Sequence, residues 1–552
     1  MTIWTELLQP KYHERYSELV ARWSRIDILV VADTIVSFAP EQDPRNLDES
    51  YFGMGHLMGV LKQVGSVTRA HRGSDPLDAP DVIENFRFDA HDLGRYDQIW
   101  LLGYQTGQLP VAEQAAIARF MNEGGGVFAT GDHAGLGSAL AGQLPRVRSM
   151  RHWAAPPPAT GFERIDTTRP DTHDVVVFEN QSDDIPQQLR LKWYEWSQSH
   201  WTKEVYPHPL LCSRAGPITE FPDHMHEGEV VLPDTLDATL GYPGMAPFDE
   251  YPRATNGERV SPEIVAWGWT SGRASPEVMH GIHIGDPDPA RARWTGTVGV
   301  YDGRRAGVGR VVVHSTWHHL FDINLIGDNA VNRPEFNDPR ESLWRLGFRA
   351  SANGQRILAQ LDQYFRNIVH WLSPGVGAFS RFDALVARIA TGHALREVME
   401  GGGAEASPQT LGLHAWQQAL RYAPPCTVMQ LTNAVLEEFL PLPRLPWDPD
   451  PGPRPDEDPR IAWPLSPRQM AQAALGGAVL AFAGLDSIEA LEGRAAVRHE
   501  GGASPAGPLR DGALRGVRQL LAEERTRSHA AGAVLDRALG ALPTTDACRT
   551  AD

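Results

Sequence analysis

The chain has 552 residues, which is too long for one hydrophobic core and indicates two to four domains. Acidic residues outnumber basic ones by 69 to 51, a formal charge of −18, so neither nucleic acid nor an anionic membrane surface is an expected partner. The three cysteines, Cys212, Cys426 and Cys548, are far apart, which argues against a disulfide framework or a thiolate metal site and favours a reducing compartment.

Neither export nor membrane insertion is indicated by the apolar stretches. Residues 1–23 mix charges with aromatics and lack the apolar core of a secretory signal. The closest candidate for a membrane span, residues 470–484, is short and rich in Ala and Gly, so it predicts a buried helix instead. We therefore expect a cytoplasmic protein.

The first part of the chain alternates predicted strands and helices. A short amphipathic helix at 11–23 leads into a continuous apolar run at 25–33, which is typical of a central parallel strand and has Asp33 at its carboxyl end. The elements that follow are a helix at 50–63, strands at 65–70 and 96–103, a helix from Pro110 to Met121 that stops at Gly124–Gly126, and a strand at 127–130. This alternation predicts an α/β fold with a doubly wound, flavodoxin-like parallel sheet covered by helices on both faces.

The remaining part of the chain, nearly three quarters of it, is less regular. Between about 151 and 305, short strand-like pieces rich in Trp, His and Pro predict a large insertion over the top edge of the sheet. A strand within 309–319 and an amphipathic helix at 355–372 close the α/β domain, and helices follow at 379–400 and 427–439, separated by a Gly-rich break. The expected division is an N-terminal helix (1–25), an α/β domain (26–374), a helical extension (376–440), a Pro-rich linker (441–467) and a small Ala-rich helical unit (468–552).

Imidazole and carboxylate groups concentrate in segments that follow two predicted strands. Asp132 and His133 lie in a glycine turn after the strand at 127–130, and His314, His318 and His319 crowd the end of the later strand. Because the carboxyl ends of parallel strands share one edge of a sheet, we expect these groups to converge there. Asp132, His133, His314 and His318 are the candidate catalytic residues, acting as general acids and bases or on a metal-bound water.

A third polar segment, residues 221–229, contains Asp223, His224, His226, Glu227 and Glu229. Two histidines one residue apart point the same way on an extended chain, so His224 and His226 can chelate together while Glu227 orients from the other side. With His318 and His319 they form the candidate ligand set for a divalent metal, Zn, Fe or Mn. The other interpretation is a solvated polar loop with one or two packed histidines.

The standard signatures of several enzyme classes are missing from the sequence. It has no P-loop, no Gly-x-Ser-x-Gly elbow, no His-Glu-x-x-His helix and no Cys-x-x-Cys, which argues against serine hydrolases, zincins and thiol redox enzymes of the usual design. Cys212 is predicted to be a buried small apolar residue rather than a nucleophile.

The order of these segments resembles the class I glutamine-amidotransferase-like superfamily, and within it the ThuA-like branch named after trehalose utilisation. The family's elbow reads Gly-x-Cys-x-Gly, and Gly131-Asp-His-Ala-Gly135 places His133 at the nucleophile position. The closing Gly309-Arg-Val strand and Asn367-Ile-Val-His-Trp371 also look like the family's final segments. The resemblance covers residues 26–374 and implies the flavodoxin-like fold, while the loss of the cysteine argues against glutamine hydrolysis.

Two functions follow from this sequence. The first is an enzyme that uses the His- and Asp-rich site, without a Cys nucleophile, for hydrolysis or chemistry on a small-molecule, sugar-type substrate. The alternative is a non-catalytic protein on an amidotransferase-like fold that binds a ligand or partner. In either case, the C-terminal helices are the expected surface for a homo-oligomer or protein partner.

Overall fold

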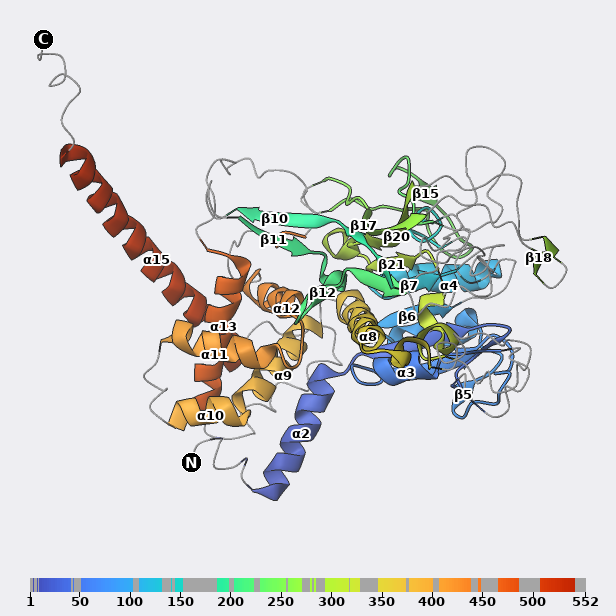
Figure 1. The fold of residues 1–552 in the computed structure, drawn as a ribbon, viewed down its shortest axis with the longest axis horizontal. Helices are drawn as coiled ribbons and strands as arrows, with labels where there is room; N and C mark the ends of the chain where they lie inside the picture. The colour runs from blue at the N-terminus through green and yellow to red at the C-terminus, as the bar shows by residue number, and fades with distance from the viewer. Residues whose placement is uncertain are drawn as a thin grey trace, which may run out of the picture.

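The computed structural model is built around one mixed β-sheet with helices on both faces, next to a group of C-terminal helices (Figure 1). Ranges 9–40, 51–102, 109–131, 144–151, 186–197, 203–222, 229–254, 257–270, 293–316, 318–327, 346–373, 377–400, 407–437, 465–485 and 507–541 are described, as are 3, 7, 43, 140, 278–279, 282–283 and 445–447.

The sheet has nine strands in the order β5-β4-β1-β6-β7-β21-β20-β17-β9. The parallel strands are β5 (Val82–Ile83), β4 (Ser66–His71), β1 (Asp27–Ala32), β6 (Gln98–Leu102), β7 (Gly126–Thr130) and β21 (Val311–His314). The other three, β20 (Arg293–Tyr301), β17 (Glu263–Thr270) and β9 (Arg190–Leu191), add antiparallel pairs. The α/β class and the parallel centre agree with the sequence prediction.

The apolar runs explain why these segments become central strands. Every residue of β6, β7 and β21 is buried, as expected for strands that are covered on both faces. One face, which includes Trp100 and Phe128, packs against α3 (Gly55–Leu61) and α8 (Ala352–Leu372). The opposite face packs against α4 (Val111–Asn122).

The predicted insertion contributes to the sheet itself. Residues 151–305 were expected to lie over the top edge of a parallel sheet, but β20, β17 and β9 extend the sheet beyond β21 instead. Short antiparallel pairs accompany them: β10 (Trp193–Ser197) with β11 (Lys203–Pro207), β12 (Cys212–Ser213) with β13 (Gly216–Pro217), β14 (Glu220–Pro222) with β8 (Pro186–Gln188), and β15 (Thr239–Leu240) with β16 (Phe248–Asp249). Two further pairs are β2 (Val36–Ser37) with β3 (Phe52–Gly53) and β18 (Val278–Met279) with β19 (Ile282–His283).

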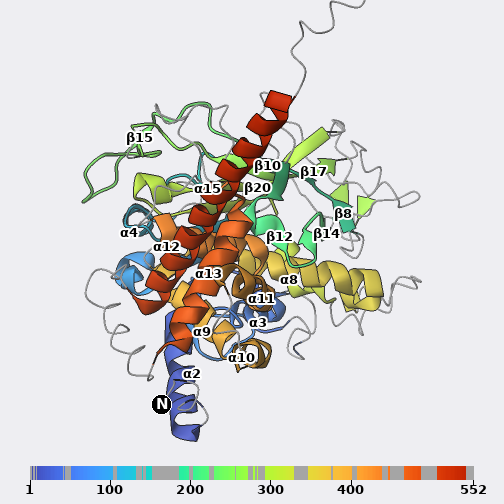
Figure 2. The ribbon, with the colours of Figure 1, turned by 90° about the vertical axis from the view of Figure 1, so that its left-hand side faces the viewer.

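A second hydrophobic core joins the C-terminal helices to the N-terminal one. Its helices are α2 (Pro10–Ser24), α9 (Ala378–Ala390), α10 (His393–Glu400), α11 (Pro408–Ala419), α12 (Pro425–Glu437), α13 (Pro467–Ala483) and α15 (Pro508–Ala541). The predicted helix at 379–400 is divided between α9 and α10, and α11 lies where a Gly-rich break was expected. The far half of α15 stands away from the other helices (Figures 1 and 2).

Glycines on α13 bring its backbone close to both neighbouring helices. A Cβ atom on Gly476 would collide with the carbonyl oxygen of Pro408 in α11, and one on Gly477 with that of Gly512 in α15. The apolar stretch at 470–484 is therefore a helix buried between helices, as the sequence predicted. Among the described helices, none combines the length and apolar character that a bilayer crossing requires.

Two cysteines are paired, contrary to the sequence prediction. Cys212 in β12 and Cys426 in α12 form a disulfide with a Cα–Cα distance of 6.3 Å, and both residues are buried. They are 214 residues apart in the chain, so their spacing gave no sign of the pairing. The bond ties the α/β part of the chain to the C-terminal helices.

Candidate functional site

The carboxyl ends of the parallel strands lie level at one edge of the sheet. His314, the last residue of β21, is in register with Thr130, the last residue of β7. Thr130 is in turn in register with Leu102 of β6, which pairs with Ala32 of β1. This edge is where an open α/β sheet collects its ligands and catalytic groups.

Two of the predicted histidines meet at this edge. The Nε2 atom of His314 lies 3.2 Å from the Nδ1 atom of His319, within hydrogen-bonding distance. His319 is in a short 3₁₀ turn, His318–Leu320, that begins four residues after the last residue of the strand. The side chains of His314 and His319 are 0% and 2% exposed, so the pair is sealed from bulk water.

Aromatic rings enclose the pair. The Phe221 ring of β14 lies 6.0 Å from His314 and 5.4 Å from His319, measured between ring centroids. Tyr364 of α8 and Phe128 of β7 contact the His314 ring from the same face of the sheet, at 5.7 Å and 6.4 Å. This apolar shell disfavours a positive charge on either imidazole.

The electrostatics keep His314 neutral. Burial lowers its pKa well below the ordinary histidine value, and the neighbouring His319 and Arg151 lower it further. A neutral imidazole has one donor and one acceptor nitrogen, so one member of the pair donates to the other. Neutral histidine is also the form that accepts a proton or binds a metal ion.

Hydrogen bonds fix the segment that follows β21. The hydroxyl of Thr130 donates to the carbonyl of Thr316 over 2.6 Å, which joins this segment to the end of β7. Arg151, only 2% exposed, donates through Nη2 to the carbonyl of Ser315 over 2.6 Å. Further along, Asp322 accepts from the backbone N–H of His56 at the start of α3, over 2.9 Å.

One described end of the predicted polar loop contacts the histidine pair, and the other is connected to the segment after β21. On one side, Phe221 contacts both imidazoles, and Pro222 is the last described residue before 223–228. At the other end, Val230 forms an isolated antiparallel β-bridge with Arg151, whose guanidinium donates a hydrogen bond to the carbonyl of Ser315. Glu229, which precedes Val230, is buried.

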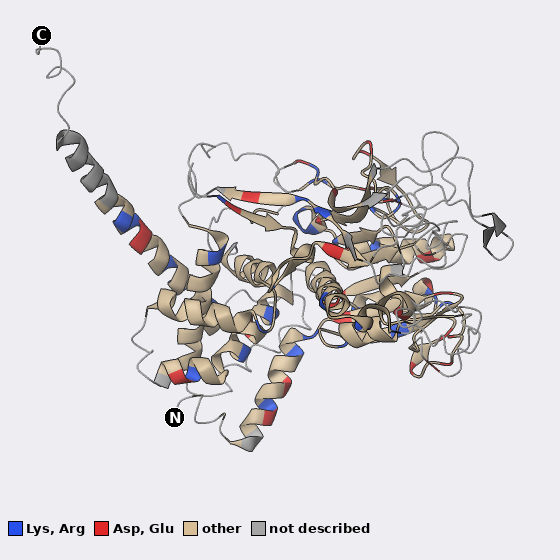
Figure 3. Ribbon diagram, viewed as in Figure 1, with Lys and Arg blue, Asp and Glu red and all other residues tan. Residues whose placement is uncertain are grey.

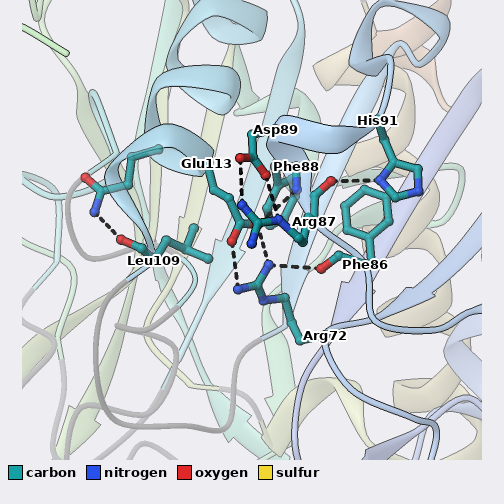
Figure 4. A network of polar contacts seen from close by, with 9 residues as sticks. Arg72, Phe86, Arg87, Phe88, Asp89, His91, Leu109 and Glu113 are labelled. Atoms are coloured by element: carbon teal, nitrogen blue, oxygen red, sulfur yellow. Dashed lines mark hydrogen bonds and ion pairs between the residues drawn. The ribbon is translucent and has the colours of Figure 1, made fainter. Parts of the chain in front are cut away.

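The end of β4 adds polar groups that the sequence did not single out. His71 is buried, and its Nδ1 atom accepts a hydrogen bond from the backbone N–H of Gly73 over 3.0 Å. Arg72, the next residue, is held by Glu113 of α4, whose Oε1 atom accepts from its Nη2 at 3.0 Å (Figure 4). The Oε2 atom of Glu113 also accepts from Nη1 of Arg72 and from the backbone N–H of Phe88.

Asp33 occupies the point where the strand order reverses. The chain moves from β1 to β4 on one side and later to β6 on the other, so Asp33 follows the strand at the topological switch. Its side chain is 8% exposed, and burial raises the pKa of its carboxyl group, while Arg72 and His71 act in the opposite direction. The sequence placed Asp33 at a strand end, but its relation to His71 and Arg72 required the strand register.

The structure places only part of the predicted site. His314 and His319 come together as expected, whereas only the backbone of His318 is described. Five predicted residues lie outside the described ranges: Asp132, His133, His224, His226 and Glu227. Within the described ranges, no three His, Cys, Asp or Glu side chains are grouped as a metal site would require.

Comparisons with known proteins add no assignment. No protein-family model, curated protein or solved structure matches the chain. The functional argument therefore depends on the geometry of the sheet edge.

Proposed function

We propose that this protein is an enzyme that uses acid/base chemistry at the carboxyl edge of its sheet, in hydrolysis or in conversion of a sugar-type substrate. The observation that carries the proposal is the neutral, hydrogen-bonded His314–His319 pair. The described ends of the other two predicted segments adjoin it: Thr130 is in register with His314, and Phe221 contacts both rings.

In this proposal the buried pair positions the reacting groups. His314 has no exposed surface and does not touch the substrate, so its role is to fix the tautomer and orientation of His319. His133 and Asp132 follow Thr130 by three and two residues in the chain, and they are the proposed general base and its carboxylate partner. A carboxylate that accepts the second ring N–H would raise the basicity of His133.

A divalent metal, Zn, Fe or Mn, is compatible with the same residues. His224, His226, Glu227, His318 and His319 are the proposed ligands, and His319 is the one whose side chain the structure describes. Such an ion would lower the pKa of a bound water towards neutrality. The resemblance to ThuA-like amidotransferase relatives remains part of the proposal, with His133 in place of the nucleophilic cysteine.

One observation favours the non-catalytic alternative. The aromatic shell leaves at most 2% of either imidazole exposed, which is also how a hydrogen-bonded core pair looks. In that case the edge would bind a ligand or partner without turning it over.

An oligomer or protein partner through the C-terminal helices likewise remains a proposal. The cytoplasmic location also remains a proposal: it was inferred from the absence of signal-like and membrane-spanning segments and from the cysteine spacing, and the Cys212–Cys426 disulfide removes only the support from the cysteines.

The test compares His133→Ala and His319→Gln with the wild-type chain. His393→Ala is the control, since His393 is 87% exposed on α10. Metal content and hydrolysis of a panel of glycosides, esters and amides are measured, with folding followed by circular dichroism. The enzyme proposal expects both variants to fold and to lose activity at least 100-fold, on the scale of a lost general base. A wild-type chain that is metal-free and inert on the panel, or His133→Ala retaining full activity, would overturn it.

A further inference from the structure

The Cys212–Cys426 disulfide lies at the border between two hydrophobic cores, the sheet core around α3 and α8 and the helical core of α2 and the C-terminal helices. It joins β12 to α12, which lie side by side (Figure 1). Leu210 and Leu211, directly before Cys212, belong to the sheet core, whereas both cysteines belong to the helical core. Because each core has its own cluster of buried apolar side chains, breaking the bond removes a tie between the two clusters and leaves each of them in place.

The sulfur of Cys426 lies at the start of a helix. Cys426 is the second residue of α12, and the first turn of this helix contains no acidic residue. The first turn of a helix carries partial positive charge, which stabilises a thiolate. A stabilised thiolate leaves more readily when a disulfide is attacked. Because Cys212 lies in a strand, Cys426 is the better leaving group of the two.

Cys212 lies beside an exposed turn. It pairs with Pro217 in the short hairpin β12–β13, and Arg214 and Ala215 in the turn of this hairpin are exposed. Cys212 is 6% exposed and Cys426 is 1% exposed. A local opening of the turn therefore uncovers Sγ of Cys212 first, which makes it the point of attack for an incoming thiolate.

The backbone of Cys212 is also fixed by contacts other than the disulfide. Nδ2 of Asn367 in α8 donates to the carbonyl of Leu210 over 2.9 Å and to that of Cys212 over 2.8 Å. Asn367 is 1% exposed, so water does not compete for these two bonds. They hold Cys212 on the sheet core when the disulfide is open, where it can form the bond again.

We propose that the Cys212–Cys426 bond is a reversible redox lock between the sheet core and the helical core, opened by a dithiol reductant. A thiolate of the reductant attacks Sγ of Cys212, the S–S bond breaks, and its electron pair leaves on Sγ of Cys426. The second thiol of the reductant then displaces Cys212, so the reductant becomes a disulfide and the protein gains two electrons and two protons. The closed lock holds α12 against β12, and the open lock lets α12 open without the sheet core. This lock does not depend on the reaction proposed for the sheet edge.

The experiment uses the full chain, either oxidised or treated with dithiothreitol without denaturant. Thiols are alkylated and located by mass spectrometry, and amide hydrogen exchange is followed in α12 and β6. We expect both cysteines to be reduced and exchange in α12 to rise at least tenfold, while exchange in β6 is unchanged. Reoxidation with oxidised glutathione should return α12 to its original rate.

Three results would overturn the proposal. The first is a bond that dithiothreitol reduces only after denaturant is added. The second is unchanged exchange in α12 after reduction. The third is an equal rise in α12 and β6, because the bond would then stabilise the whole chain and would not act between the cores.

A monothiol tests the direction of attack. Reduced glutathione forms a mixed disulfide with the attacked cysteine, and iodoacetamide alkylates the cysteine that is released. We expect glutathione on Cys212 and the alkyl group on Cys426. Glutathione mainly on Cys426 would contradict the assigned leaving group.

Substitutions that prevent the bond provide a second test. Cys212→Ser and Cys426→Ser should show the fast α12 exchange of the reduced chain without any reductant. Cys548→Ser is the matched control, since Cys548 takes no part in the bond, and it should exchange like the oxidised wild-type chain. Slow α12 exchange in both Cys212→Ser and Cys426→Ser would count against the lock, and the dithiothreitol experiment on the wild-type chain decides if these variants do not fold.

Discussion

The ion pair between Arg72 and Glu113 provides the sharpest stability prediction, because it fixes the end of β4 beside the candidate site. The Glu113 side chain is 1% exposed and that of Arg72 is 18% exposed. Glu113 accepts from both Nη atoms of Arg72 and from the backbone N–H of Phe88, while Nη1 of Arg72 also donates to the carbonyl of Phe86 over 3.0 Å. We predict that Glu113→Gln destabilises the sheet strongly.

The size of the destabilisation follows from the loss of the carboxylate that pairs with Arg72. The substitution retains the shape of Glu113 and one oxygen that can accept from Phe88, but it leaves the guanidinium charge without its carboxylate. Removing one partner of a buried pair costs about 3–5 kcal/mol. Since Arg72 is partly exposed, water can solvate part of the charge, so we expect about 3 kcal/mol, at the lower end of that range.

The assay is urea unfolding followed by circular dichroism and tryptophan fluorescence, comparing midpoints at equal slope. Asp89→Asn is the matched control, because Asp89 pairs with Arg87 in the same network but at the exposed surface (Figure 4). Its midpoint is expected to stay at the wild-type value, since exposed pairs contribute little. Adding Arg72→Met to Glu113→Gln should recover part of the loss. A midpoint for Glu113→Gln equal to that of Asp89→Asn would refute the reasoning.

Three further predictions concern thiols and pH. Thiol titration of the denatured, unreduced chain should find one free cysteine, Cys548; three would contradict the disulfide. Cys426→Ala should lower the unfolding free energy by about 2–5 kcal/mol while Cys548→Ala leaves it unchanged, as urea unfolding can show. Burial lowers the pKa of His208 to about 3, so below pH 6.5 the unfolded chain binds a proton that the folded chain does not. His208 should therefore lower the free energy of unfolding by about 1.4 kcal/mol for each pH unit as the pH falls from 6.5 to 3. This contribution should be absent in His208→Asn.

Local patterns predicted the centre of the fold. The apolar runs at β1, β6 and β7 are covered on both faces of the sheet, as a continuous apolar run indicates. The start and end of α4 followed from Pro110 and the glycines after it. The antiparallel strands β17 and β20 were missed because their pairing with β21 depends on contacts between distant segments.

The predicted Gly-rich break between two C-terminal helices was wrong for a physical reason. The Gly-rich break predicted between two helices contains α11, with Gly412 in its middle. A glycine weakens an isolated helix by about 1 kcal/mol, so the sequence favoured a break there. In the structure a Cβ atom on Gly412 would collide with the backbone of Gln472 in α13. Close packing between helices therefore outweighs local propensity at this position.

The candidate site was predictable to the extent that it follows strand ends. His314 and His319 lie at the end of a strand that the sequence shows, so their convergence could be predicted. His71 and Arg151 could not, because nothing in their local sequence marks them. They join the edge through the β1–β4 register and through the bond from Arg151 to the carbonyl of Ser315.

The free-energy cost of burying the His314–His319 pair distinguishes the two proposed functions. Nδ1 of His314 is buried and has no hydrogen-bond partner among the described residues, so packing alone would be better served by an apolar ring. Phe221, Phe128 and Tyr364 already form the surroundings such a ring needs. If the pair is retained for chemistry, His314→Phe should leave stability unchanged or higher while activity is lost. If the pair is a structural element of a binding protein, the same substitution should lower the unfolding midpoint, because His319 loses its partner.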